Sequence, residues 1–66
     1  MVGKIMKYSE LKKFLIKNGC RFDHSGGRHE IWYSPITKKV FPVARHKTED
    51  VAKGTLKSIL RAAGIE

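Results

Sequence analysis

The sequence predicts an α+β fold with the element order α-β-β-β-α, in which two helices cover one face of a three-stranded antiparallel sheet. Apolar residues recur at helical spacing near both ends of the chain, and short β-like runs separated by turn residues lie between them. The chain has 66 residues, and a chain of this length buries only about 60% of the surface that its unfolded form exposes. One thin core is therefore expected, in a single domain over residues 1–66.

The first helix is expected over about residues 9–18. Ser9 is the expected N-cap, and Glu10 at the first helical position interacts favourably with the helix dipole. Gly19 supplies the C-terminal stop. The positions that follow the i, i+3, i+4, i+7 spacing are Leu11, Phe14, Leu15 and Asn18.

Three short strands are expected in the middle of the chain. Their predicted bounds are residues 20–24, 29–34 and about 39–44. A turn at residues 25–27 makes the first two strands a hairpin, and residues 35–38 form a second turn. Pro42 indicates that the third strand is an edge strand or contains a bulge.

Alternation along the second strand divides its side chains into two sets, with His29, Ile31 and Tyr33 on one side and Glu30, Trp32 and Ser34 on the other. Both sets are partly apolar, so alternation leaves open which side faces the helices. Trp32 and Tyr33 are candidates for stacking on bases, although core packing is favoured for at least one of them.

The last segment returns to helical spacing. Residues 48–50 form a start signal and Gly64 a stop signal. Gly54 weakens the first turn by about 1 kcal/mol relative to alanine, so the regular helix is expected from about Lys53. The expected apolar face consists of Val51 or Ala52, Leu56, Ile59, Leu60 and Ala63.

The composition is strongly basic, with 14 Lys and Arg against 6 Asp and Glu and a net charge of +8. This charge suggests a polyanionic partner, which is nucleic acid, anionic lipid or an acidic protein. No apolar run approaches the roughly 20 residues that span a bilayer, and the N-terminus lacks a signal-peptide pattern. A cytoplasmic location with no membrane partner is therefore expected.

Cys20 is the lone cysteine, which excludes an internal disulfide and leaves too few ligands for structural zinc, so no metal is expected.

The residues that remain as candidates for chemistry are Gly26-Gly27-Arg28-His29 and the pair Arg45-His46, because standard enzyme signatures are absent. Glycines allow a phosphate to approach the backbone, and Arg28 can meet that phosphate as a planar fork. His29 can remove a proton from a ribose 2′-OH or protonate the 5′ leaving oxygen near neutral pH. The alternatives are an exposed or core-edge histidine and a solvated basic surface. The candidate RNA contacts are Arg28, Lys38, Lys39, Arg45, His46 and Lys47.

The chain resembles the HicA toxin family, also called the YcfA type, from bacterial and archaeal toxin–antitoxin systems. The resemblance extends from Lys7 to Ile65. Residues 7–19 resemble the first helix of the family, which ends in Gly, and residues 26–32 resemble its Gly-Ser-His strand entry. Residues 42–46 and 53–65 resemble its closing strand and C-terminal helix.

This resemblance implies a fold similar to a double-stranded RNA-binding domain and the activity of a type II toxin, a metal-independent mRNA endoribonuclease without cofactor. It also implies neutralisation by a HicB-type antitoxin. The catalytic histidine of the family corresponds to His29. Arg28 stands where a small Ser is frequent, so Arg28 either binds phosphate or occupies surface.

Two other functions fit the same residues. One is a non-catalytic RNA-binding module, since a small basic α/β domain suits shape-specific binding to duplex RNA. The other is a protein-binding role in which the basic face meets an acidic partner. Cleavage of RNA separates the toxin from both.

Overall fold

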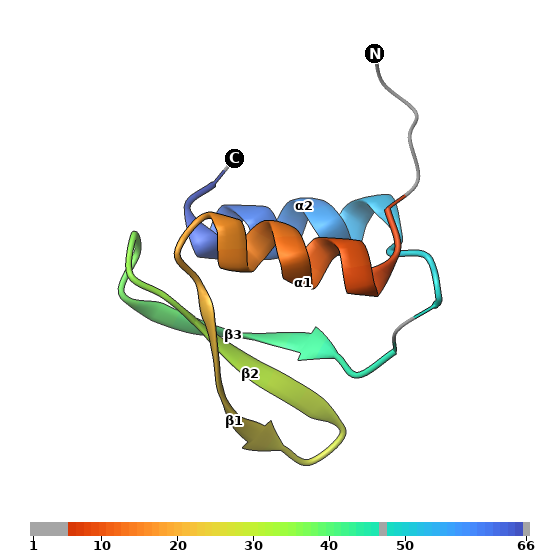
Figure 1. Cartoon of the computed structure of the whole chain (residues 1–66), viewed down its shortest axis with the longest axis horizontal. Helices are drawn as coiled ribbons and strands as arrows, with labels where there is room; N and C mark the ends of the chain where they lie inside the picture. Colours follow the sequence, from red (N-terminus) through yellow and green to blue (C-terminus); the bar gives the residue numbers. More distant parts are fainter. Residues whose placement is uncertain (1–5, 47, 66) are drawn as a thin grey trace.

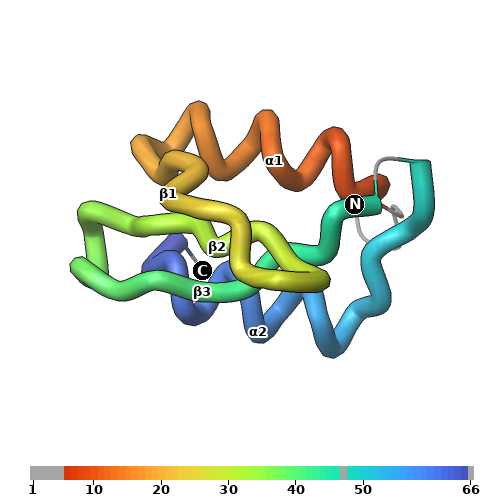
Figure 2. Tube along the Cα trace, turned by 90° about the horizontal axis from the view of Figure 1, so that it is seen from below, coloured from red at the N-terminus to blue at the C-terminus, as the bar shows by residue number. Residues whose placement is uncertain are grey.

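The computed structural model describes residues 6–46 and 48–65, and in it two helices lie over a three-stranded antiparallel sheet (Figure 1). The elements in chain order are α1 (Tyr8–Lys17), β1 (Arg21–Gly26), β2 (His29–Ser34), β3 (Lys39–Ala44) and α2 (Lys53–Ala63). The strand order is β1-β2-β3, so β2 is central and β3 is an edge strand. Figures 1 and 2 show both helices on the same side of the sheet, running in the same direction. The predicted fold class and element order are confirmed.

The N-terminus of α1 differs from the prediction, because Lys7 and not Ser9 is the N-cap. The Lys7 N–H donates to Glu10 Oε1 at 3.0 Å, which satisfies one of the free donors at the helix start. Lys7 also forms an antiparallel bridge with Asp50, and its own backbone is extended. The long-range bridge therefore moves the helix start to Tyr8. At the other end Asn18 is the C-cap, and its side-chain amide donates to the Phe14 carbonyl at 2.9 Å.

The β1–β2 hairpin is longer than predicted. Gly26 pairs with His29, so the turn consists of Gly27 and Arg28 instead of residues 25–27. Gly27 has a φ of 66°, a conformation that glycine adopts at low cost at the first position of a two-residue hairpin turn. The register shifts between Phe22 and His24, which places an irregularity in the middle of β1.

The structure decides which side of β2 faces the helices. Trp32 is 4% exposed and pairs with the buried Phe41 of β3, and Ser34 is fully buried. His29, Ile31 and Tyr33 therefore belong to the other face. Trp32 is a core residue, with its ring edge-on to Phe22 at a centroid distance of 6.4 Å.

The core lies between the helices and the sheet. On α2 the buried residues are Ile59 and Ala63, with Leu56 and Leu60 partly buried, so the predicted apolar face is confirmed. Gly64 ends α2 in the left-handed conformation, as its sequence position predicted. The buried apolar residues are Tyr8, Leu11, Leu15, Cys20, Trp32, Phe41, Val43, Val51, Ile59 and Ala63.

Side chains from the β2–β3 turn hold the C-terminus of α2. Ser34 Oγ donates to the Ala63 carbonyl at 2.6 Å, and Thr37 Oγ1 donates to the Ala62 carbonyl at 2.8 Å. Ser34 Oγ also accepts from the Ile36 N–H at 3.2 Å. These bonds satisfy carbonyls that the end of a helix leaves without an intrahelical partner.

A second set of bonds joins the segment before α2 to the start of α1. The Tyr8 N–H donates to the Glu49 carbonyl at 3.1 Å, and the Val51 N–H donates to the Met6 carbonyl at 2.8 Å. The Lys7 ammonium lies 3.3 Å from Asp50 Oδ1. The chain is therefore anchored on both sides of α2.

Glu30 ties α1 to the sheet. Its Oε1 accepts from the Trp32 indole N–H at 2.9 Å and lies 3.2 Å from the Lys12 ammonium. Burial by itself raises the pKa of Glu30, but the hydrogen bonds from Trp32 and Lys12 and the charges of Lys12 and Arg45 outweigh burial. The pKa of Glu30 therefore lies below its ordinary value of 4.5.

Replacing Ser34 with alanine tests the anchor at the end of α2. The Ala63 carbonyl and the Ile36 N–H then lose a buried partner, and we expect the free energy of unfolding to fall by about 1–3 kcal/mol. Chemical denaturation measures this change, with Ser58→Ala as the control because Ser58 is exposed on α2. Equal losses in both variants would contradict the assigned role of Ser34.

The Lys12–Glu30 pair predicts a pH-dependent contribution to stability. Because the folded pKa of Glu30 is lowered, the stabilisation is complete above the unfolded value of 4.5 and is lost as the pH falls through the folded value. A double-mutant cycle with Lys12→Met and Glu30→Gln is expected to give a coupling of about 1 kcal/mol at pH 7 and a smaller one at pH 3. A coupling that stays constant between these two pH values would disprove the assignment.

Candidate functional site

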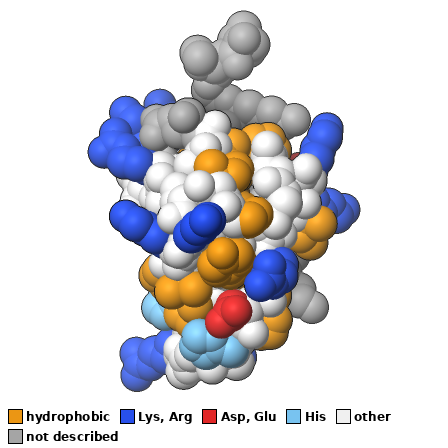
Figure 3. Space-filling view, turned by 90° about the vertical axis from the view of Figure 1, so that its left-hand side faces the viewer, with side chains coloured by type: hydrophobic (Ala, Val, Ile, Leu, Met, Phe, Trp, Pro, Cys, Tyr) orange, Lys and Arg blue, Asp and Glu red, His pale blue; other side chains and the backbone are white. Residues whose placement is uncertain are grey.

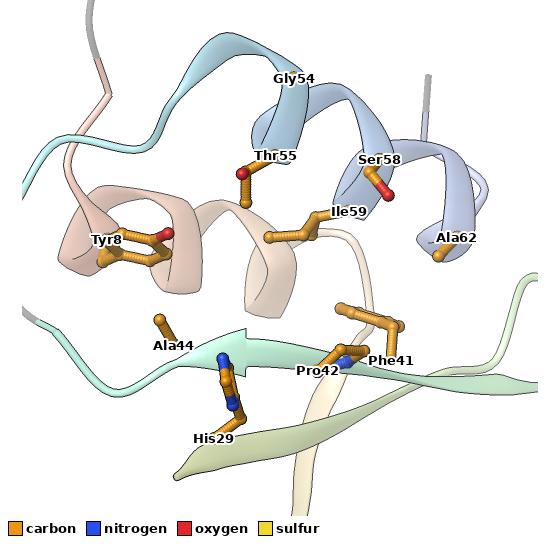
Figure 4. A pocket seen from close by; sticks show the side chains of 10 residues that line it. All are labelled: Tyr8, His29, Phe41, Pro42, Ala44, Gly54, Thr55, Ser58, Ile59 and Ala62. Carbon is orange, nitrogen blue, oxygen red and sulfur yellow. The ribbon is translucent and has the colours of Figure 1, made fainter.

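A cleft of about 460 Å³ opens between the edge strand β3 and α2 (Figure 4). β3 borders the cleft below and α2 borders it above (Figure 4). Tyr8 also lines it, as does His29, whose strand position belongs to the sheet face that points away from the helices. Figure 4 shows the side chains of α2 directed down toward β3. The lining residues are Tyr8, His29, Phe41, Pro42, Ala44, Gly54, Thr55, Ser58, Ile59 and Ala62.

The β-sheet register positions His29 at this cleft. His29 is the first residue of β2 and pairs with Gly26 on one side and Ala44 on the other. Its side chain is exposed, and Figure 4 shows the ring passing alongside β3 toward Ala44. An imidazole in this position is accessible to a large ligand and borders a cleft at the same time.

The polar groups of the cleft come mainly from the first turns of α2. Thr55 and Ser58 are exposed and line the cleft together with the apolar residues Phe41 and Ile59. The N-cap Ala52 makes no side-chain capping bond, and the first turn contains no acidic residue. The N-terminal end of a helix carries a partial positive charge, so this end of the cleft favours negative charge.

Arg45 connects the end of β3 to the turn that precedes His29. Its Nη2 donates to the Gly27 carbonyl at 2.7 Å and also to Ser25 Oγ. The predicted phosphate contact therefore has an internal structural role as well. Arg28 lies in the same turn and is exposed.

His46 lies at the same end of the sheet. Its ring centroid is 5.8 Å from that of Tyr8, and its Nε2 is 3.5 Å from Glu49 Oε1. The structure thus brings Arg28, Arg45 and His46 to the end of the sheet that carries His29. Lys47 was predicted to join them and lies outside the described residues.

Lys38 and Lys39 are not part of this group. They lie in and after the β2–β3 turn, and Lys39 pairs with Ser34 at the opposite end of β2 from His29. Five residue steps of about 3.4 Å separate the two ends of the strand. Figure 3 views the molecule from the β2–β3 turn end and shows Lys and Arg side chains spread around hydrophobic groups. The positive charge is distributed over this face and is not concentrated in one patch.

Sequence reasoning did not find the part of the site that α2 contributes. Thr55, Ser58 and Ala62 follow a helical i, i+3, i+7 spacing beside the apolar face. This stripe of small residues was the available signal, but it is equally typical of a solvated helix surface. These three residues line a cleft only because α2 packs over β3 in the folded protein.

Two structural searches of the described residues bear on the class of site. Among residues 6–46 and 48–65, no group of three or more His, Cys, Asp or Glu is placed to hold a metal ion. No helix in the same part of the chain is long and apolar enough to cross a bilayer.

Comparison with known proteins assigns the chain to a family. The family model described as the HicA toxin of bacterial toxin–antitoxin matches residues 8–65. The chain therefore belongs to the HicA toxin family, and the resemblance seen in the sequence is confirmed. A search of curated proteins gave no match, and a search of solved structures gave none either.

Removing the Arg45 side chain tests its role beside His29. Arg45→Ala deletes two hydrogen bonds to the β1–β2 turn, and we expect amide hydrogen exchange in residues 25–29 to accelerate about five- to tenfold. Arg28→Ala is the matched control, because it removes the same charge from the turn without removing those bonds. Equal exchange rates in the two variants would show that Arg45 does not hold the turn.

Proposed function

We propose that this HicA family member is the toxin of a type II toxin–antitoxin system and acts as a metal-independent mRNA endoribonuclease. The observation that carries the proposal is the exposed imidazole of His29 beside a cleft whose ten lining residues include no carboxylate. Family membership supports the toxin role, and the net charge of +8 supports a polyanionic substrate. His29 is the proposed general acid or base.

The chemistry requires proton transfer at one or two oxygens. Cleavage forms a bond between the ribose 2′-oxygen and phosphorus and breaks the bond between phosphorus and the 5′-oxygen. The 2′-OH loses a proton, and the 5′-oxygen gains one. His29 transfers a proton at one of these atoms, a contribution that is typically about 10²- to 10⁴-fold in rate.

The cations near His29 are proposed to bind the RNA backbone. Arg28 projects from the turn beside His29, where a guanidinium can stabilise charge on the transferring phosphoryl group. Arg45 and His46 extend the positive charge on the same side, and Lys47 follows them in the sequence. Lys38 and Lys39, at the far end of the sheet, are proposed to contact phosphates remote from the cut.

The proposed regulator is a HicB-type antitoxin, which would block RNA access to His29. An acidic protein suits the net charge of +8, since complementary charge speeds association and selects the partner. The toxin would act in the cytoplasm, where mRNA and the antitoxin are both present. No cofactor is assigned to the reaction.

An RNA cleavage assay in EDTA tests the function and the residue together. We expect the wild-type protein to cut single-stranded RNA in the chelator and His29→Ala to be slower by at least about 100-fold. His24→Ala is the control, because His24 is an exposed histidine on the neighbouring strand, paired with Asp23 at 2.7 Å.

Three results of that assay would count against the proposal. Cleavage by His29→Ala at the wild-type rate would eliminate His29 as the catalytic group. Salt-sensitive RNA binding by the wild-type protein without any cleavage would favour a non-catalytic RNA-binding module. Equal losses in His29→Ala and His24→Ala would point to a general effect of histidine removal.

A further inference from the structure

We propose that the cleft between β3 and α2 binds one nucleobase of the RNA, next to the phosphate on which His29 acts. This inference rests on the proposed ribonuclease function and adds to it a specificity-determining pocket. In this pocket, residues in the first turns of α2 would form hydrogen bonds with the edge of the base. Apolar residues of β3 would pack against the flat face of the same base.

The size and lining of the cleft match a base better than a backbone segment. Its volume of about 460 Å³ lies in the lower part of the range for small-molecule sites, which is enough for a single planar ring system. Its walls present Phe41, Pro42 and Ile59, which suit the apolar faces of a base. Bases that are splayed out of single-stranded RNA are recognised in this way.

The hydroxyls of Thr55 and Ser58 provide the polar component. Both residues are exposed on α2 and line the cleft beside its apolar wall, as Figure 4 shows. A hydroxyl both donates and accepts, so two of them can pair with the donor and acceptor groups on the edge of a base. Their separation by three residues places them on one face of the helix.

The electrostatics of the cleft are compatible with a polyanionic ligand such as RNA. None of its ten lining residues is acidic, and His29 is one of them. Lys53 opens α2, and the first turn of the helix carries no acidic residue. A sugar–phosphate backbone can therefore run along the rim without meeting a carboxylate from the cleft, while its base turns inward.

Filling the cleft tests the proposal by enzymology. Ser58→Phe places a ring in the space assigned to the base, and we expect cleavage of a mixed-sequence RNA to fall about tenfold or more, in line with the energy of one base–aromatic stack. The smaller change Ser58→Ala keeps the space open and is expected to alter the distribution of cut sites among the four bases. Cleavage by Ser58→Phe with wild-type rate and pattern would overturn the proposal.

Lys57→Phe is the matched control. It adds the same ring at the neighbouring position of α2, outside the residues that line the cleft. Lys57→Phe also removes a positive charge, whereas Ser58→Phe does not. A general loss of RNA affinity would therefore be larger in Lys57→Phe than in Ser58→Phe. Thermal denaturation of each variant establishes that the domain is folded. An equal loss of cleavage in Lys57→Phe would assign the effect to the helix surface and contradict a pocket.

A binding measurement separates failure of the pocket from failure of the ribonuclease. Nucleoside monophosphates are titrated into the folded His29→Ala protein, and NMR signals of the Ile59 methyls and the Ser58 amide are followed. We expect shifts at these positions that differ between bases and that disappear in Ser58→Phe. The result does not depend on cleavage. The proposal would be overturned if none of the four nucleotides shifted the signals of Ile59 and Ser58. It would also be overturned if Ser58→Phe changed inhibition by the antitoxin but left RNA cleavage and nucleotide binding unchanged.

Discussion

The C-terminal end of α2 is held to the last residue of β2 by a hydrogen bond that is buried at the end of the molecule remote from His29. Ser34 Oγ donates to the Ala63 carbonyl, and Ser34 is fully buried. Thr37 donates a second hydrogen bond, to the Ala62 carbonyl, so two bonds join the β2–β3 turn region to the end of α2. Losing a buried partner is costly, which makes this contact resistant to small displacements. The backbone bonds between residues 49–51 and the start of α1 fix the opposite side. The cleft lies between these two anchors and derives its shape from them.

His29 owes its position to a different set of contacts. The turn at Gly27 and Arg28 starts β2, and Arg45 returns from the end of β3 to bond that turn. One arginine, predicted as a phosphate contact, thus also supports the strand that presents the imidazole. If Arg45 also binds phosphate as proposed, it would serve both folding and binding in a chain of only 66 residues.

The candidate site combines an imidazole from the sheet with hydroxyls from a helix far away in the sequence. General acid–base chemistry needs a group within hydrogen-bond reach of the reacting oxygen, and binding must hold the substrate in that geometry. In the proposed function, His29 at the sheet end would supply the first requirement and the β3–α2 cleft the second.

By itself the sequence determined the order of the elements and the C-terminal end of α2, because these depend on local periodicity and glycine positions. The choice of His29 as the candidate group rests on residue chemistry and on the family resemblance, and it stays a prediction. Only the tertiary structure decided that Trp32 faces the helices, since both sides of β2 are partly apolar and alternation cannot choose between them. The tertiary structure also places the start of α1 at Tyr8, because Lys7 forms a bridge with Asp50. No local sequence pattern predicts this bridge. Thr55 and Ser58 became part of a site for the same reason. Their place in the cleft depends on how α2 packs over the sheet, and that packing involves residues about 30 positions apart, such as Ser34 and Ala63.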